Sequence, residues 1–191
     1  MGGAFQGPAA LTWIGFVESW HEFYLMAGTA AVTLAGLLFV AISLHVEALV
    51  HESREHLLGL ARVTLFSFVF VLMVALMMLV PHQGMRPRGA SLAAIGVAFF
   101  AVTFRQLRSR GVDHADFSGR LFRRRLWAPM VGYAGTAAVG VMLLRGRAEA
   151  LYYLIAITCL LLGNAAGTSW DLLVRVARIR RRGTEADRER G

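Results

Sequence analysis

Five long stretches of the chain contain no Asp, Glu, Lys, Arg or His. They are residues 23–44, 63–81, 89–104, 126–144 and 150–170. An α-helix rises about 1.5 Å per residue, so about 20 residues cross a hydrocarbon core of about 30 Å. None of the stretches shows the sustained alternation of apolar and polar residues that is typical of strands. The sequence therefore predicts an all-α fold, an integral membrane helical bundle.

The composition agrees with this fold class. Hydrophobic residues make up 57% of the chain and charged residues 17%, whereas soluble domains average about 45–50% and about 25%. These values exclude disorder and disfavour a water-soluble globule.

We expect residues 1–182 to form one transmembrane domain that starts with a short N-terminal interfacial helix. We expect residues 183–191 to form a disordered tail, because Gly183 is a natural helix stop and the residues after it are polar.

The third stretch is the shortest. Its 16 residues span only about 24 Å as a helix. Arg88 and Arg105 flank it, and their long side chains can carry the charges back to the headgroups. We therefore expect five transmembrane helices. The alternative is four crossings plus one re-entrant or interfacial helix at residues 89–104.

The arginines predict an orientation. All 20 basic residues are arginine, and cytoplasmic loops carry the excess of such residues. Five crossings with the N-terminus outside and the C-terminus in the cytoplasm place 16 arginines inside and 4 outside. Four crossings give the same ratio. The rule therefore places residues 105–125 and the C-terminus inside, and leaves the side of the N-terminus and of residues 45–62 open.

Two arginine clusters lie beside the last two stretches. Anionic headgroups attract a segment of this kind by about 1 kcal/mol per basic residue, so we expect both clusters to contact anionic lipid at the cytoplasmic face. Docking of an acidic protein is the alternative for the second cluster. We predict no nucleic-acid binding, because the arginines lie between apolar segments. The clusters are Arg123, Arg124 and Arg125, and then Arg175, Arg178, Arg180, Arg181 and Arg182.

Small residues recur four apart in the last two stretches. Helices in lipid gain little hydrophobic energy by associating, so small residues that allow close backbone contact matter. The link of five residues, 145–149, makes the two helices antiparallel neighbours, and we expect their small faces to meet. We also expect a hydrogen bond between Tyr133 and Asn164. Homo-oligomerisation is the alternative use of this spacing, which involves Gly132, Thr136, Gly140, Gly163 and Gly167.

Bulky side chains dominate the second stretch, residues 63–81. It is rich in Phe, Leu, Met and Val and has few small residues. We therefore expect it to face lipid.

Two clusters of His and Glu are weak candidates for a metal site. The segment at 45–56 nearly spells the zinc motif HExxH, but His51 and His56 are five residues apart and point about 140° apart on a helix. The pairs Glu47/His51, His51/Glu55 and Glu52/His56 do share a face, and they could bind a divalent metal. Glu18 and His21 match half of a di-iron motif. Solvated helices with pairs four apart explain the same pattern.

No nucleophile elbow, phosphate loop or dinucleotide fingerprint is present, and we predict no cofactor. The single cysteine, Cys159, excludes an internal disulfide. The stretches also lack the intramembrane charges that transporters use. We predict a non-enzymatic accessory or scaffold subunit of a larger membrane complex, with a membrane-protein partner or its own copies. The alternatives are an oligomeric channel or small-solute transporter, and then a metal-dependent membrane enzyme.

Two segments carry a resemblance to known proteins. Residues 27–45, AGTAAVTLAGLLFVAISLH, resemble the opening helix of small uncharacterised multipass proteins of bacteria. Asn164 followed by Trp170-Asp171-Leu172-Leu173 looks similar to their closing segment. The resemblance implies a bacterial inner (plasma) membrane. It brings no activity and no active residues.

Overall fold

The computed structural model describes residues 15, 20–44, 55–81, 83–109 and 117–188. These residues form five long helices and, within the described ranges, no strand. All five helices contain a segment long and apolar enough to cross a membrane, which confirms the predicted all-α bundle. The helices are α2 (His21–Leu44), α4 (Glu55–Leu79), α5 (Met85–Ser109), α6 (Phe117–Leu144) and α7 (Ala150–Arg188).

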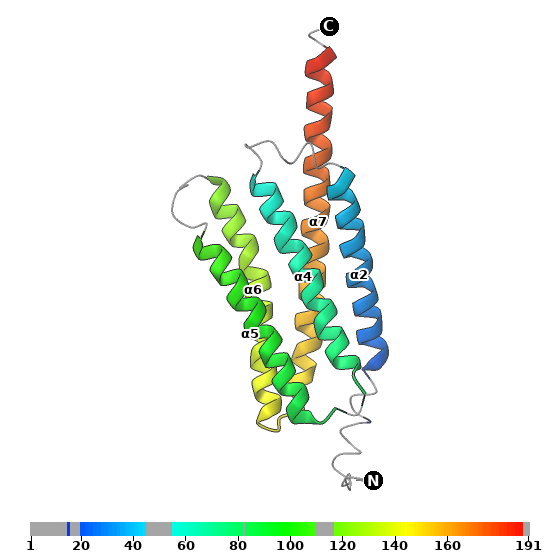
Figure 1. Ribbon diagram of the computed structural model, residues 1–191, viewed down its shortest axis with the longest axis vertical. Coiled ribbons are helices and arrows are strands. Elements are labelled where there is room, and N and C mark those ends of the chain that lie inside the picture. Colours follow the sequence, from blue (N-terminus) through cyan, green and yellow to red (C-terminus); the bar gives the residue numbers. More distant parts are fainter. Residues whose placement is uncertain (1–14, 16–19, 45–54, 82, 110–116, 189–191) are drawn as a thin grey trace.

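The helices run up and down along one axis (Figure 1). Helices α2, α5 and α7 run toward the end drawn at the top of Figure 1, which we call the upper end, and α4 and α6 run toward the lower end. The chain therefore enters the bundle at the lower end and leaves it at the upper end. An odd number of crossings follows from these directions.

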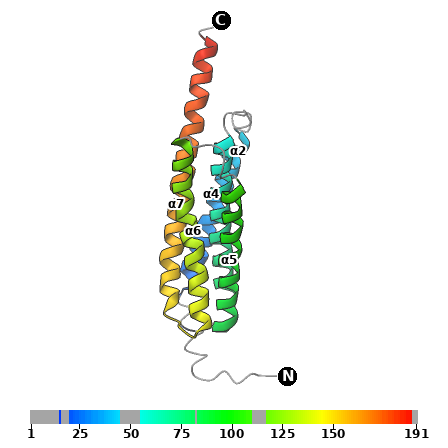
Figure 2. The same ribbon diagram turned by 90° about the vertical axis from the view of Figure 1, so that its left-hand side faces the viewer.

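The short third stretch belongs to a full-length helix. Helix α5 has 25 residues, packs along α6 (Figure 2) and contains a candidate span from Met85 to Gln106. Arg88 does not extend to the headgroups as predicted, because its side chain is buried. Its Nη2 donates a hydrogen bond of 2.8 Å to the carbonyl oxygen of Val80. This bond satisfies a carbonyl just after the C-terminus of α4, where helical partners run out.

Helix α4 lies at the centre of the bundle, so the prediction that it faces lipid is wrong. It contacts each of the other four helices. Its bulky side chains fill the space between them, and small residues on the neighbours let α4 approach. A Cβ atom added to Gly28 of α2 would lie 3.1 Å from Cβ of Ala75. The buried apolar side chains of α4 include Phe68, Phe70, Val71, Val74 and Met78.

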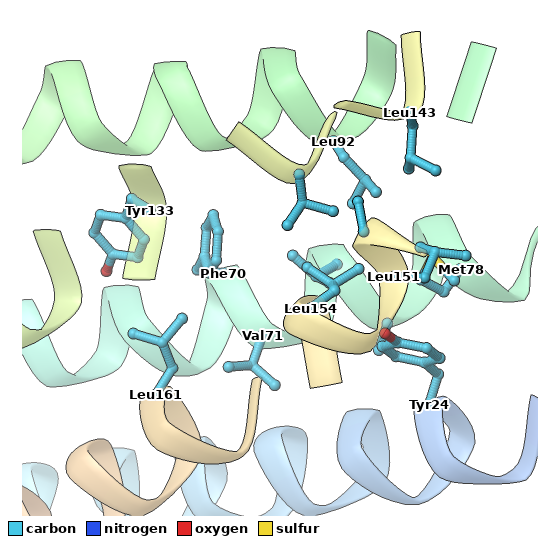
Figure 3. Packing of buried hydrophobic residues seen from close by; sticks show 14 of the residues in the cluster. Tyr24, Phe70, Val71, Met78, Leu92, Tyr133, Leu143, Leu151, Leu154 and Leu161 are labelled. Carbon is cyan, nitrogen blue, oxygen red and sulfur yellow. The ribbon is translucent and has the colours of Figure 1, made fainter. Parts of the chain in front are cut away.

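All five helices contribute to the main core. Figure 3 shows Tyr24 of α2, Leu92 of α5 and Leu154 of α7 among the buried side chains that meet between the helices. Small residues of α2 take part, since Ala27 and Ala31 are buried. The interior is thus filled mainly by apolar side chains.

The turn between α6 and α7 is a Schellman motif. Gly146 has φ of 81°, a left-handed conformation that glycine adopts without the penalty of a Cβ atom. The Arg147 amide donates to the Met142 carbonyl at 3.0 Å, and the Gly146 amide donates to the Leu143 carbonyl at 2.9 Å. The tight turn makes α6 and α7 antiparallel neighbours, as predicted.

Each helix extends beyond its apolar stretch, and α6 and α7 do so by many residues at the upper end. Helix α6 begins at Phe117, before the stretch at 126–144, and α7 continues through Gly183 to Arg188. The predicted helix stop at Gly183, and with it a tail that is disordered from that residue, is therefore wrong. An internal glycine costs a helix only about 1 kcal/mol relative to alanine, and Arg181 and Glu185 have the spacing of a favourable pair. The predicted N-terminal interfacial helix and residues 189–191 lie outside the described residues.

Candidate functional site

A seam of glycines joins α5 and α6. A Cβ atom added to Gly96 would lie 2.7 Å from the Ala137 amide nitrogen, and one added to Gly140 would lie 2.6 Å from the Gly89 carbonyl oxygen. Both distances are too short for a real Cβ atom, so the two backbones touch where glycine allows it. Gly140 thus serves close packing as predicted, but its partner is α5 and not α7.

The contact between α6 and α7 differs from the predicted meeting of two small faces. Gly132 and Gly135 of α6 accept apolar side chains of α7: added Cβ atoms would lie 2.7 Å from Cγ of Leu161 and 2.9 Å from Cδ1 of Ile157. Thr136 is buried beside them and donates to the Gly132 carbonyl at 3.0 Å. Large side chains of α7 therefore fill the small face of α6.

Gly163 and Gly167 point away from the bundle, so their predicted packing on α6 is wrong. Both are exposed, and added Cβ atoms would have no neighbour within 4 Å. Their helical phase explains this. Gly163 is two residues after the buried Leu161, or about 200° around the helix.

The predicted hydrogen bond between Tyr133 and Asn164 is also not formed. The Tyr133 hydroxyl lies 3.2 Å from Oγ of Ser67 on α4. Oγ of Ser67 also lies 3.1 Å from the Val63 carbonyl oxygen, to which it donates its one proton. Tyr133 is therefore the donor to Ser67. This pair was missed because α4 was expected to face lipid.

Aromatic rings surround this polar pair. The Tyr133 ring lies 4.5 Å from the Phe70 ring and 5.8 Å from the Phe99 ring, measured between centroids. Rings at such distances attract one another in tilted arrangements. The cluster joins α4, α5 and α6, and its one internal hydrogen bond fixes the rotation of α6 against α4. It is a structural feature of the bundle.

One face of α7 is covered by no other described part of the chain. We call it the α7 outer face and define it by Ala156, Leu160, Gly163, Gly167 and Trp170, which are all exposed. Asn164 lies at its edge and is half-buried. The Asn164 side chain makes no hydrogen bond to another described residue, and only its backbone carbonyl accepts one, from Thr168 at 2.8 Å.

The His and Glu candidates do not come together. His21 begins α2 at the lower end, and Glu55 and His56 begin α4 at the upper end (Figure 1). Among the described residues, no three His, Cys, Asp or Glu side chains are placed to hold a metal ion. Glu18, His51 and Glu52 lie outside the described residues.

The two arginine clusters lie at the upper end. Arg123, Arg124 and Arg125 belong to the N-terminal part of α6, and Arg175 to Arg182 belong to the last part of α7. Only the helical backbone is described at these positions. Helix α7 continues past the other helices along the axis of the bundle (Figures 1 and 2).

Comparison with protein-family models, with curated proteins and with solved structures finds no match for this chain. The five apolar helices define the class of this protein as a multipass helical membrane protein.

Proposed function

We propose that the protein is a non-enzymatic accessory or scaffold subunit of a larger membrane complex, and that the α7 outer face binds its membrane partner. One observation carries the proposal. Gly163 and Gly167 form a small surface that nothing in the described chain fills.

In a membrane, a surface of small residues favours binding of another helix. Lipid tails are as apolar as leucine side chains, so helices associate in a bilayer through close packing and hydrogen bonds. Glycines four apart allow a partner helix to approach its backbone. The same chain uses glycine in this way at the seam of α5 and α6, where Gly140 meets Gly89.

Asn164 supports the same proposal. Its amide carries both donors and acceptors, and it lies within the candidate span Ala150–Val174. An unbonded amide in hydrocarbon is costly. Interhelical hydrogen bonds of such groups contribute about 0.6–2 kcal/mol. A partner helix on the α7 outer face gives Asn164 a bonding partner at the edge of the contact.

The interior favours binding over transport. Two buried threonine hydroxyls within the described spans bond to their own helix, Thr136 to the Gly132 carbonyl at 3.0 Å and Thr158 to the Leu154 carbonyl at 2.8 Å. Apolar side chains from all five helices fill the centre. A function at the outer surface needs no path through this core.

The proposed location is a bacterial inner membrane, with the C-terminus in the cytoplasm and the N-terminus outside. Two arguments support this orientation. The C-terminal end of α5, the N-terminal end of α6 and the C-terminal end of α7 lie at the same end of the bundle, and the 16 to 4 distribution of arginines supports a cytoplasmic location for that end.

The test is purification from native membranes in a gentle detergent, with copurifying chains identified by mass. We expect a stoichiometric membrane partner with the wild type and its loss on G163L/G167L. The matched control is Gly36→Leu, because Gly36 of α2 is also exposed and open. The partner should remain with this control.

Each other outcome contradicts part of the proposal. If both variants keep the partner, the α7 outer face is not the contact. A chain that always runs alone and carries stoichiometric metal or haem overturns the scaffold function. If the only copurifying chain is another copy of the protein, it is a homo-oligomer instead.

A further inference from the structure

The two arginine clusters lie at different distances from the centre of the membrane. Gly132 of α6 meets Leu161 of α7, and Gly135 meets Ile157. Because α6 and α7 are antiparallel, residue numbers decrease along α6 and increase along α7 toward the upper end of the bundle. The same register places Arg124 level with about residues 168–169 of α7, which is next to Trp170.

Trp170 marks the upper membrane interface. It is 68% exposed, and tryptophan prefers the headgroup level. Arg123, Arg124 and Arg125 are therefore at headgroup depth. Arg178 and Arg182 lie 8 and 12 residues past Trp170, or about 12 and 18 Å further along the helix. A headgroup layer is only about 5–8 Å thick on each side, so α7 carries these arginines past it.

We propose that residues 175–188 of α7 are a docking segment for an acidic, amphipathic helix of a partner protein in the aqueous phase, whereas the α6 cluster contacts lipid. The cytoplasmic location of this docking rests on the orientation given under the proposed function. The docking itself is separate from the α7 outer face within the membrane.

Charge complementarity identifies the partner as acidic. Five arginines lie from residue 175 to residue 182, and no acidic residue occurs between Arg175 and Glu185. Salt screens charges beyond about 8–10 Å, so a lipid surface attracts Arg182 only weakly.

The sequence also favours a protein over a nucleic acid. Val176 and Ile179 lie three residues apart among the arginines, a spacing that places them on one face of a helix. An apolar strip beside positive charges suits an amphipathic acidic helix. The phosphate backbone of a nucleic acid offers no apolar surface to pack against this strip.

The test uses the full-length protein in nanodiscs of neutral phosphatidylcholine, with fluorescent poly-L-glutamate as the probe. We expect R178Q/R181Q/R182Q to weaken binding about tenfold, because exposed ion pairs contribute up to about 1 kcal/mol each. The matched control R123Q/R124Q/R125Q removes the same charge and should change binding less than about twofold. Circular dichroism checks that both variants keep their helix content.

Two further measurements on the wild type separate the alternatives. Replacing part of the lipid with phosphatidylglycerol should change poly-L-glutamate binding little, because the docking segment stands clear of the headgroups. If anionic lipid abolishes binding, the segment lies on the membrane and the proposal fails. Equal losses for both triple variants, or tighter binding of single-stranded DNA than of poly-L-glutamate at equal charge and salt, also overturn it.

Discussion

At the scale of single residues, the hydrogen bond between Tyr133 and Ser67 is the polar contact that ties α6 to α4. We expect Tyr133→Phe to lower the free energy of unfolding by about 0.6–1.7 kcal/mol, the range measured for such bonds in membrane helices. A double-mutant cycle with Ser67→Ala, followed by unfolding in mixed micelles, measures the coupling.

The control for this prediction is a second cycle. Tyr133→Phe and Asn164→Leu should be additive, since these side chains do not bond to each other. A coupling between Tyr133 and Asn164 that exceeds the coupling to Ser67 contradicts the described arrangement.

Gly146 gives a second prediction at this scale. Its φ of 81° penalises any residue with a Cβ atom by about 1–2 kcal/mol. Gly146→Ala should therefore destabilise the turn by about this amount, measured by thermal unfolding in detergent. Gly36→Ala is the control, because Gly36 is helical and open, and it should leave stability unchanged or raise it slightly. Equal stability of the two variants contradicts the Schellman turn.

At the scale of elements, Gly140 serves the packing of the fold, whereas Gly163 is open to a partner helix. A side chain at Gly140 collides with backbone atoms of Gly89 and Ala93 on α5, whereas one at Gly163 meets nothing within 4 Å. We expect Gly140→Leu to destabilise the fold by several kcal/mol and to lower the yield of monodisperse protein. Gly163→Leu should fold normally. The reverse result in size-exclusion chromatography and unfolding contradicts the assigned helix faces.

The existence of the helices was predictable, but their rotation was not. A long stretch without charged residues is enough to predict a transmembrane helix, and such stretches identified all five helices. Which face of α7 points inward leaves little trace in its composition, because lipid and core both accept apolar side chains. Leu161 packs on Gly132 while Gly163 faces outward, and either arrangement satisfies the sequence. The pairing of Tyr133 with Ser67 depends on the same rotations.

The central position of α4 could not be predicted for a related reason. Bulky residues suit a lipid-facing helix as well as one that fills the gaps between four neighbours. Phe70 is buried against Phe99 of α5 and Tyr133 of α6, whereas Ala75 of α4 lies against Gly28 of α2. That complementarity belongs to the assembled bundle. The buried Arg88 was missed for the same reason, since its acceptor is the Val80 carbonyl just after the end of α4.

At the scale of the whole molecule, five crossings decide which segments share a side. Residues 45–54 connect the upper ends of α2 and α4, and residues 110–116 connect those of α5 and α6. Both links are therefore expected on the side of the C-terminus. Four crossings, with residues 89–104 re-entrant, would put residues 45–54 on the opposite side from the C-terminus.

Site-directed labelling tests this most directly. In a Cys159→Ser background, single cysteines replace Val50, Val112 and Ala148, and a membrane-impermeant maleimide is added to intact cells. We predict that only the cysteine at position 148 reacts, and that those at positions 50 and 112 react after the membrane is opened. Labelling of position 50 in intact cells, with position 112 protected, would contradict the five-helix account.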